Sequence, residues 1–299
     1  MRVGADIPNA GPLPARLGVG RMAAVAEAAG AESLWVSDHL LMVDADTTDY
    51  PFTEDGRPSW PVDAPYLEAL TCCSFMAAAT STCRIGTAIL VLPQRNVLEV
   101  AKTAATLDVL SGGRLVLGVG AGWYRQEFEA LGYDYDSRGR RLDEMLQVLR
   151  ACWTGRPPAF AGSELRIPPD VVLEPVPAQK GGPPLLVGGG SRAALRRAAL
   201  RADGWLGIAW VGCLDLDALG RQVETFRRFG ADARLGPGQA VLKLHAAPED
   251  AGRLPAALQE LEALGFDEVI VEPPWALGED AASEAIRAAR AAVRVRAPQ

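Results

Sequence analysis

Histidine and cysteine are scarce in this chain of 299 residues, which has two histidines and five cysteines. The cysteines are Cys72, Cys73, Cys83, Cys152 and Cys213. They are odd in number and mostly have apolar neighbours, which favours buried thiols in a reducing compartment over disulfides. No grouping of His, Cys or carboxylate residues has the spacing of a ligand set, so the sequence predicts no metal site.

Long apolar runs and excess positive charge are also lacking. No run reaches the roughly 18 apolar residues that a membrane helix needs. Met1 leads directly into a strand-like segment rather than a signal peptide, so we expect a cytoplasmic protein. The net charge of -7 argues against nucleic acid or an anionic membrane as a partner, because both repel a negative protein. An anionic cofactor would need a local basic patch.

What the chain does contain is a regular alternation of short apolar runs and helical patterns. Glycine-bounded runs such as residues 115–119 are typical of strands buried on both faces. We expect strands at residues 2–7, 33–37, 84–91, 115–119, 185–187, 205–210, 240–245 and 268–272. Eight strand–helix units without a break in composition predict one (β/α)8 barrel domain over residues 1–299. A doubly wound sheet is the alternative.

Helices and two long loops fill the spaces between these strands. We expect helices at residues 15–29, 66–79, 96–110, 192–202, 214–229, 254–264 and 281–293, and two more after the fourth strand. A polar loop at residues 41–64 follows the second strand. Residues 155–184, beyond the fourth strand, form an irregular insertion with a hairpin near SELRIP. Loops of this length are commonly lids or binding segments.

In such a barrel the active site lies at the carboxyl ends of the strands. Glycine and polar residues recur at the expected strand ends. The residues found there include Asn9, Asp38, Ala88, Gly120, Gly188, Ile208, His245 and Glu272. We therefore look for the site among them.

A glycine-rich turn joins the fifth strand to its helix. It consists of Gly188, Gly189, Gly190 and Ser191. Backbone N–H groups and the helix dipole at such a turn favour a phosphate group. Arg192, Arg196 and Arg197 would add positive charge. The alternative is a tight turn with solvated arginines.

A second glycine turn, Gly120-Ala121-Gly122, follows the fourth strand and precedes Trp123 and Tyr124. It allows a flat or charged ligand to lie against the backbone. The segment GVGAG is not a dinucleotide fingerprint, because Trp123 occupies the third glycine position and the expected acidic residue has no counterpart. A nicotinamide-binding domain is therefore not expected.

Several stretches together resemble one family. They are SLWVSDHLL (33–41), PYLEALT (65–71), RIGTAILVLPQRNVLEVAKTAATLDVLSGGRL (84–115), GGRLVLGVGAGWYRQEFEALGYDYDSRGRRLDEMLQVLRACW (112–153) and LLVGGGSRAALRRAALRADGW (185–205). In this order they resemble the luciferase-like family of flavin- and deazaflavin-dependent oxidoreductases, most of all its coenzyme F420-dependent branch. The likeness covers most of residues 1–210 and is only general after Leu214.

The resemblance implies a barrel fold and a cofactor site. It places Gly120, Ala121 and Gly122 beside the flavin or deazaflavin ring and assigns Asp38 and Gln126 to the cofactor site. It also implies a bulge at Ala88-Ile89 behind the ring, commonly through a non-proline cis peptide. An ordinary core strand is the alternative there.

His39 and Asp38 are the candidate catalytic residues, and His39 is the one expected to act on the substrate. An imidazole in general can gain or lose a proton near neutral pH, so a histidine here can orient or exchange a proton at a substrate oxygen while a hydride moves to or from the ring. A structural hydrogen-bonded pair is the alternative. His245 has no matching motif, and we expect a structural role for it.

One residue that departs from the family pattern bears on the substrate. Sugar-phosphate dehydrogenases of the family carry a glutamate directly after the second glycine, where this chain has Trp123. An apolar or aromatic substrate near Trp123, Trp60 and Trp210, with Asn9 at the same rim, is therefore expected rather than an anionic sugar. Each tryptophan could equally belong to the core.

The leading hypothesis is an F420-dependent oxidoreductase that moves a hydride between the deazaflavin C5 and an organic small molecule. The alternatives are an FMN-dependent monooxygenase on the same fold and a non-catalytic protein that binds flavin or deazaflavin. A cofactor-free hydrolase or lyase would need a nucleophile or metal cluster at the strand ends, and the sequence offers none. The family resemblance also implies a homodimer.

Overall fold

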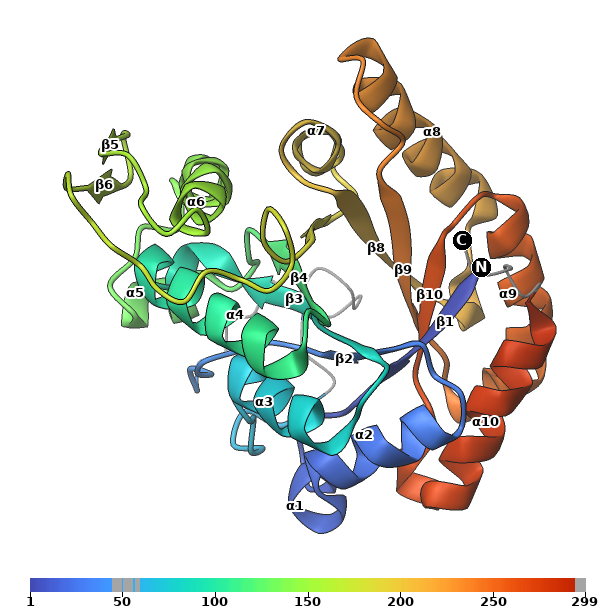
Figure 1. Ribbon diagram of the computed structural model, residues 1–299. Helices are drawn as coiled ribbons and strands as arrows, with labels where there is room; N and C mark the ends of the chain where they lie inside the picture. The colour runs from blue at the N-terminus through green and yellow to red at the C-terminus, as the bar shows by residue number, and fades with distance from the viewer. Residues whose placement is uncertain (45–49, 51–55, 57–59, 294–299) are drawn as a thin grey trace.

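Eight parallel strands form a closed barrel in the computed structural model, which describes residues 1–44, 50, 56 and 60–293 (Figure 1). The barrel strands are β1 (Arg2–Asp6), β2 (Ser33–Val36), β3 (Arg84–Val91), β4 (Leu115–Gly120), β7 (Leu185–Gly188), β8 (Gly204–Trp210), β9 (Gln239–His245) and β10 (Glu268–Val271). They follow one another around the barrel in chain order, and β1 closes the ring by pairing with both β10 and β2. The predicted (β/α)8 barrel is confirmed, and the doubly wound sheet is wrong.

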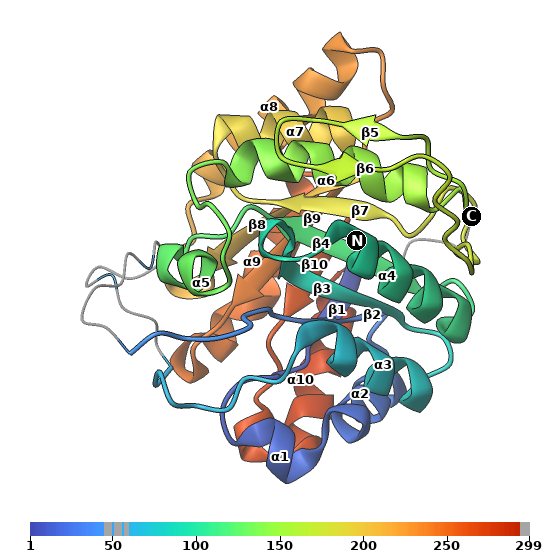
Figure 2. The same cartoon turned by 90° about the vertical axis from the view of Figure 1, so that its left-hand side faces the viewer.

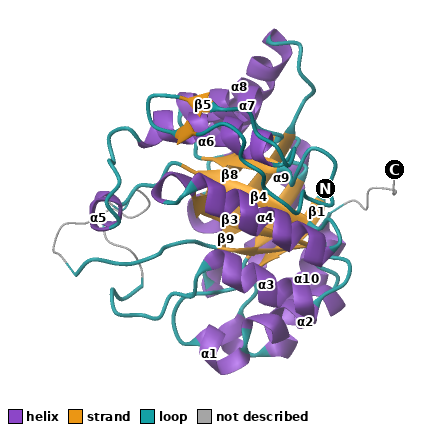
Figure 3. Cartoon of the chain, turned by 60° about the vertical axis from the view of Figure 1, so that its left-hand side comes forward, coloured by secondary structure: helices purple, strands orange, loops and turns teal. Residues whose placement is uncertain are grey.

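The helices surround the strands on the outside (Figure 3). They are α1 (Leu13–Leu17), α2 (Val19–Ala28), α3 (Ala69–Ala79), α4 (Val97–Ser111), α5 (Arg125–Ala130), α6 (Arg138–Cys152), α7 (Arg192–Arg201), α8 (Leu216–Asp232), α9 (Leu254–Ala263) and α10 (Glu279–Ala292). Single turns of 3-10 helix occur at η1 (Leu92–Gln94), η2 (Val211–Cys213) and η4 (Trp275–Leu277), and a longer one at η3 (Pro248–Arg253). Among these described helices, none combines the length and the apolar character needed to cross a bilayer.

Two predicted helices differ from the observed ones. The helix expected at residues 15–29 is divided into α1 and α2 at Gly18, whose φ of 79° does not continue a right-handed helix. The helix expected from residue 66 begins only at Ala69, because Glu68 caps it by accepting a hydrogen bond from the Thr71 amide at 2.7 Å.

The predicted hairpin in the insertion after α6 is present. Strands β5 (Phe160–Ala161) and β6 (Arg166–Ile167) pair antiparallel and lie beside α6 (Figure 2). Glu144 of α6 holds the hairpin turn, since its carboxylate accepts hydrogen bonds from the backbone amides of Ser163, Glu164 and Leu165. The loop predicted at residues 41–64 lies largely outside the described residues.

The barrel interior is an apolar layer over a charged floor. Side chains from alternating positions fill the layer, namely Trp35, Val116, Leu186, Leu206, Val241 and Ile270. Beneath them Glu268 is fully buried and accepts hydrogen bonds from Ser33 Oγ at 2.5 Å, Trp35 Nε1 at 3.1 Å and Arg2 Nε at 3.1 Å, and from Arg84. These partners compensate a carboxylate whose burial would otherwise be costly.

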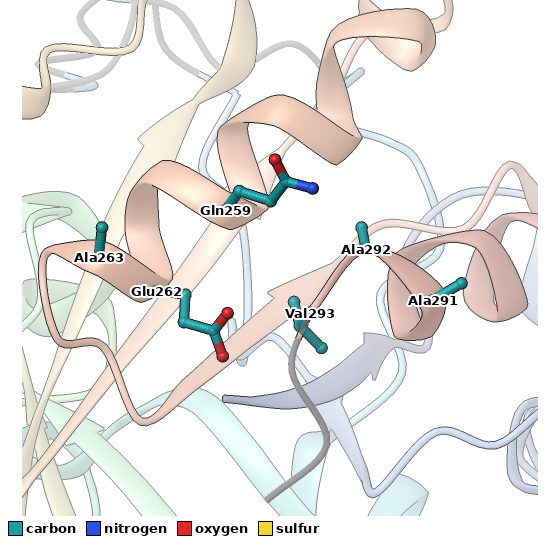
Figure 4. Close-up of a pocket in the computed structure, with 6 residues that line it drawn as sticks. All are labelled: Gln259, Glu262, Ala263, Ala291, Ala292 and Val293. Carbon is teal, nitrogen blue, oxygen red and sulfur yellow. The ribbon is translucent and has the colours of Figure 1, made fainter.

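A hollow of about 530 Å³ lies between the carboxyl ends of α9 and α10 (Figure 4). Its lining is mostly alanine and valine, with Gln259 and Glu262. Glu262 is paired with the amino group of Met1 at 2.8 Å. Since Met1 precedes β1, the hollow is at the amino-terminal face of the barrel, opposite the rim where barrel enzymes carry their chemistry.

We expect Glu27 to make the stability of the fold acid-sensitive. Its carboxylate joins α2 to the start of β3 by accepting hydrogen bonds from the amides of Ser81, Thr82 and Cys83 and from Thr82 Oγ1. Burial alone would raise the pKa of Glu27, but these hydrogen bonds lower it from 4.5 to about 2. A depressed pKa means that the stabilisation is fully present above pH 4.5 and is lost as the pH falls towards 2.

Urea unfolding of Glu27→Gln at pH 7 and pH 3 tests this. The variant should be less stable by about 1–2 kcal/mol at pH 7, and its deficit should shrink at pH 3. The exposed Glu129→Gln should match the wild-type protein at both pH values. An equal deficit at the two pH values would show that the Glu27 carboxylate does not carry the effect.

Candidate active site

The carboxyl ends of the strands surround a cavity of about 370 Å³, here called the mouth cavity. Four aromatic side chains line it, from Tyr50, Trp60, Tyr66 and Trp210, together with four ionisable ones, from Asp6, Lys243, His245 and Glu272. Pro8, Asn9, Ala10, Ser37, Ala246 and Ala247 complete the lining. An aromatic wall with a few polar groups at this volume is typical of small-molecule sites.

His39 lies at this rim three residues after β2 and is 7% exposed. It is not among the residues that line the mouth cavity, but its ring is beside the lining residues Trp60 and Tyr66. Its Nδ1 is 2.9 Å from Oε2 of Glu127, a residue of α5 that is 1% exposed. The other carboxylate oxygen, Oε1, accepts hydrogen bonds from the amides of Leu40 at 2.6 Å and Leu41 at 3.3 Å. A carboxylate can only accept, so Nδ1 of His39 carries the proton in the neutral ring. The Nε2 lone pair is then available to a bound molecule.

Glu127 was missed by the sequence analysis, which looked for a carboxylate only at the position of Trp123. The carboxylate that contacts the histidine comes from the next helical turn instead. The available signal was the helix pattern: in α5, Glu127 and Phe128 face inward while Glu129 is exposed. An acidic residue on the buried face of a short helix needs a specific partner.

Aromatic rings enclose the His39 imidazole. The ring centroids of Tyr66, Trp123 and Trp60 lie 5.5, 5.7 and 6.0 Å from it. Nε1 of Trp60 is buried and has no hydrogen-bond partner among the described residues. Because an unpaired buried donor is costly, this atom is suited to an acceptor on a bound molecule.

Asp38 is directed to β3 rather than to the imidazole of His39. Its carboxylate accepts hydrogen bonds from the Val91 amide at 2.9 Å and from Arg95 at 2.7 Å. Burial raises the pKa of Asp38, and Arg95 and the Val91 amide oppose that rise. In this arrangement Asp38 braces the end of β3 beside the predicted bulge.

The predicted bulge in β3 is present. The register with β4 shifts between Thr87 and Leu90, and the Ala88-Ile89 peptide is cis, as the resemblance implied. The Ile89 side chain lies between two glycines of neighbouring strands. A Cβ at Gly120 would be 2.7 Å from Ile89 Cδ1, and one at Gly188 would be 2.8 Å from Cγ2. A side chain at either glycine would therefore require Ile89 to shift.

Side-chain hydrogen bonds hold the turn after β4. Gly122 has φ of 82°, and its carbonyl accepts a hydrogen bond from Arg138 Nε at 3.2 Å. The Trp123 carbonyl accepts one from the Tyr135 hydroxyl at 2.9 Å. Ala121 and Gln126 are half-buried, and neither lines the mouth cavity.

The turn after β7 is exposed and lies at the start of α7. Gly189 donates its amide to Leu206 O at 3.2 Å, and its φ of 113° favours glycine. Ser191 caps α7 by accepting a hydrogen bond from the Ala194 amide at 3.2 Å. The amides that follow Gly189 belong to the helix start, where N–H groups lack intrahelical acceptors and favour an anion.

The three arginines predicted to assist this turn have different partners. Arg197 is paired with Asp143 at 2.8 Å, so its charge is already balanced. Arg192 lies over the Phe229 ring at 5.1 Å, and Arg196 is exposed. Arg192 and Arg196 are therefore the ones with charge to offer a phosphate.

Of the predicted substrate residues, Asn9, Trp60 and Trp210 line the mouth cavity. Trp123 does not line it, but its ring lies 5.0 Å from that of Tyr50. The Asn9 amide is fully engaged with backbone groups, donating to Ser37 O at 2.9 Å and Leu67 O at 2.7 Å and accepting from Ser37 N at 3.2 Å. Asn9 thus shapes the cavity wall.

A second group of polar side chains lines the same cavity, and the sequence analysis named His245 and Glu272 of it but missed Asp6 and Lys243. Lys243 is 2.7 Å from Asp6 and 2.9 Å from Ser37 Oγ. His245 Nδ1 is 2.7 Å from Glu272 Oε1. Burial raises the pKa of Asp6, while Lys243 opposes that rise. Burial also acts to raise the pKa of Glu272, but the hydrogen bond and charge of His245 lower it below its ordinary value.

Comparison with known proteins agrees with this architecture. An uncharacterized protein of Mycobacterium tuberculosis is 34% identical over 87% of this chain and 86% of its own length. An FMNH2-dependent dimethylsulfone monooxygenase of Pseudomonas putida is 37% identical, over 46% of this chain and 38% of its own.

In structure, the chain is similar to an F420-dependent secondary alcohol dehydrogenase solved with an F420–acetone adduct. The TM-score is 0.78 at 18% identity, over 97% of this chain and 99% of that one. Residues 8–246 match the luciferase-like monooxygenase family. The chain therefore belongs to the luciferase-like monooxygenase family.

Proposed function

We propose that the protein is an F420-dependent oxidoreductase that transfers a hydride between the deazaflavin and an uncharged organic substrate in the mouth cavity. The observation that carries this proposal is the His39–Glu127 pair, which leaves an imidazole nitrogen available among aromatic rings at the barrel rim. Family membership supports a flavin or deazaflavin cofactor. The bulge at Ala88-Ile89, which the family resemblance associates with F420, favours the deazaflavin.

The residues at the rim fit such a cofactor. The start of α7 after Gly189, with Arg192 and Arg196, would hold the phosphate. Ile89 and the Gly120–Gly122 turn would lie against the ring. When bound, the deazaflavin supplies the hydride acceptor or donor at its C5.

His39 would handle the proton that accompanies the hydride. With Nδ1–H donated to Glu127, its Nε2 would take the proton of a substrate hydroxyl during oxidation, or return it during reduction. Positive charge on the imidazole would be stabilised by the adjacent carboxylate. The surrounding rings would exclude water from this exchange.

An FMN-dependent monooxygenase is the second candidate, favoured by the similarity to the dimethylsulfone monooxygenase. The phosphate turn suits either cofactor. A non-catalytic cofactor-binding protein is the third candidate.

Titration with each cofactor separates the first two candidates. We expect the protein to quench F420 fluorescence at micromolar concentration and to bind FMN at least about tenfold more weakly. A tenfold ratio of the two dissociation constants is a clear difference in binding free energy. Binding of FMN alone would overturn the F420 assignment.

His39→Ala should bind F420 like the wild-type protein but lose about 100-fold or more in turnover with a panel of alcohols. Absence of turnover by the wild-type protein would favour the non-catalytic candidate.

Glu127→Gln tests the origin of the His39 geometry. An amide can donate or accept, so the variant should lose the strong preference for Nδ1–H, and it should be destabilised by about 1–3 kcal/mol. Nitrogen-15 imidazole spectra report the tautomer, and the chain has just two histidines to assign. Glu129→Gln, on the exposed face of the same helix, is the matched control. An unchanged His39 tautomer in Glu127→Gln would refute the positioning role.

A further inference from the structure

Both histidines of the chain are held at the barrel rim in the same way, each by a glutamate at Nδ1. His39 is paired with Glu127 at 2.9 Å, and His245 with Glu272 at 2.7 Å. The His245 ring also stacks on Trp210, with centroids 5.0 Å apart and planes 16° apart. The proposed hydride step uses only His39, so the second pair has no role in it.

We propose that the His245–Glu272 pair is a substrate-binding site that accepts a hydrogen bond from a hydroxyl group on a flat, aromatic substrate. The pair would determine specificity in the same mouth cavity that Trp60 and Tyr66 line. The inference rests on the proposed function only in taking the mouth cavity as the place of the substrate.

The direction of the hydrogen bond follows from Glu272. Its Oε1 lies 2.7 Å from Nδ1 of His245, and a carboxylate can only accept a hydrogen bond. In the neutral ring Nδ1 therefore carries the proton, and Nε2 presents a lone pair. His245 lines the cavity with 23% of its side chain exposed, which leaves room for a contact from within.

The charges of the cavity disfavour an anionic substrate. Asp6 and Glu272 contribute two carboxylates, while Lys243 contributes the one ammonium group of the lining residues. That ammonium is already held by Asp6 and Ser37, and its side chain is 6% exposed. A carboxylate or phosphate on the substrate would thus approach Glu272 without a free cation to pair with.

The aromatic lining supplies the rest of the recognition. Trp60 and Tyr66 line the mouth cavity and also lie beside the His39 ring. Their ring centroids are 6.0 and 5.5 Å from the centroid of the His39 ring. One molecule lying against them would therefore reach from His39 towards His245. A substrate with a flat apolar ring and a hydroxyl at its far end would fit here, because the ring would lie against the aromatic side chains and the hydroxyl would reach His245.

Three probes of nearly equal size test the proposal on the intact protein by calorimetry: 2-phenylethanol, its methyl ether and phenylacetate. Only the first has a neutral hydroxyl donor. We expect 2-phenylethanol to bind about tenfold more tightly than the ether, and phenylacetate to bind more weakly still, because one hydrogen bond corresponds to about that factor.

His245→Phe keeps a ring against Trp210 but removes the acceptor nitrogen. It should bind 2-phenylethanol about tenfold more weakly and the ether as the wild-type protein does. Glu249→Gln, an exposed change in the loop after β9, should leave both affinities unchanged. Thermal unfolding of each variant checks that it is folded. If His245→Phe does not fold, Glu272→Gln provides a second test, because it weakens the preference of His245 for the tautomer with the proton on Nδ1.

Imidazole spectra identify the place of binding. The His245 nitrogen signals should shift with 2-phenylethanol and remain unchanged with the ether. Equal binding of alcohol and ether, no binding of the alcohol, or shifts confined to His39 would each overturn the proposal. Failure of F420 and FMN to bind would instead overturn the proposed function, and His245→Phe should leave cofactor affinity as it is.

Discussion

Closure of the barrel by β1, which pairs with β10 on one side and β2 on the other, is the constraint on which the rest depends. Because all eight strands are parallel, closure brings every carboxyl end to one rim. His39 and Glu127, which are 88 positions apart in the chain, come into contact there, and so do His245 and Glu272. At the other face, the buried Glu268 and its arginine and tryptophan partners close the floor.

The rim divides into two kinds of surface with different tasks. The turns after β4 and β7 offer backbone and a helix start, and Gly120 and Gly188 leave the space that the Ile89 side chain occupies between them. The strand ends β9 and β10, with β1, offer ionisable side chains that are already paired with one another. Such pairing engages Nδ1 of each histidine, and a site built to make a hydrogen bond of defined direction can be selective.

Much of this architecture could be predicted from the sequence, because apolar periodicity and glycine turns are local signals. The barrel and the hairpin after α6 were expected on these grounds and are present. The bulge at Ala88-Ile89 is present too, but only the family resemblance implied it. The partners of buried polar groups could not be predicted in the same way. Asp38 contacts Arg95, and Lys243 contacts Asp6, only because strand register and helix placement bring them together. Glu127 lies on a helix whose inward face is defined by packing, so its contact with His39 is a tertiary property.

The proposed function requires this rim to bind a phosphorylated, flat redox ring beside His39. A crystal structure of the protein soaked with F420 would show whether it does. We expect the ring against Ile89 and the Gly120–Gly122 turn, the phosphate at the start of α7, and His39 Nε2 facing the open side of the ring. A ring bound away from His39, or no density for F420 at the rim in crystals that do not bind FMN either, would contradict it.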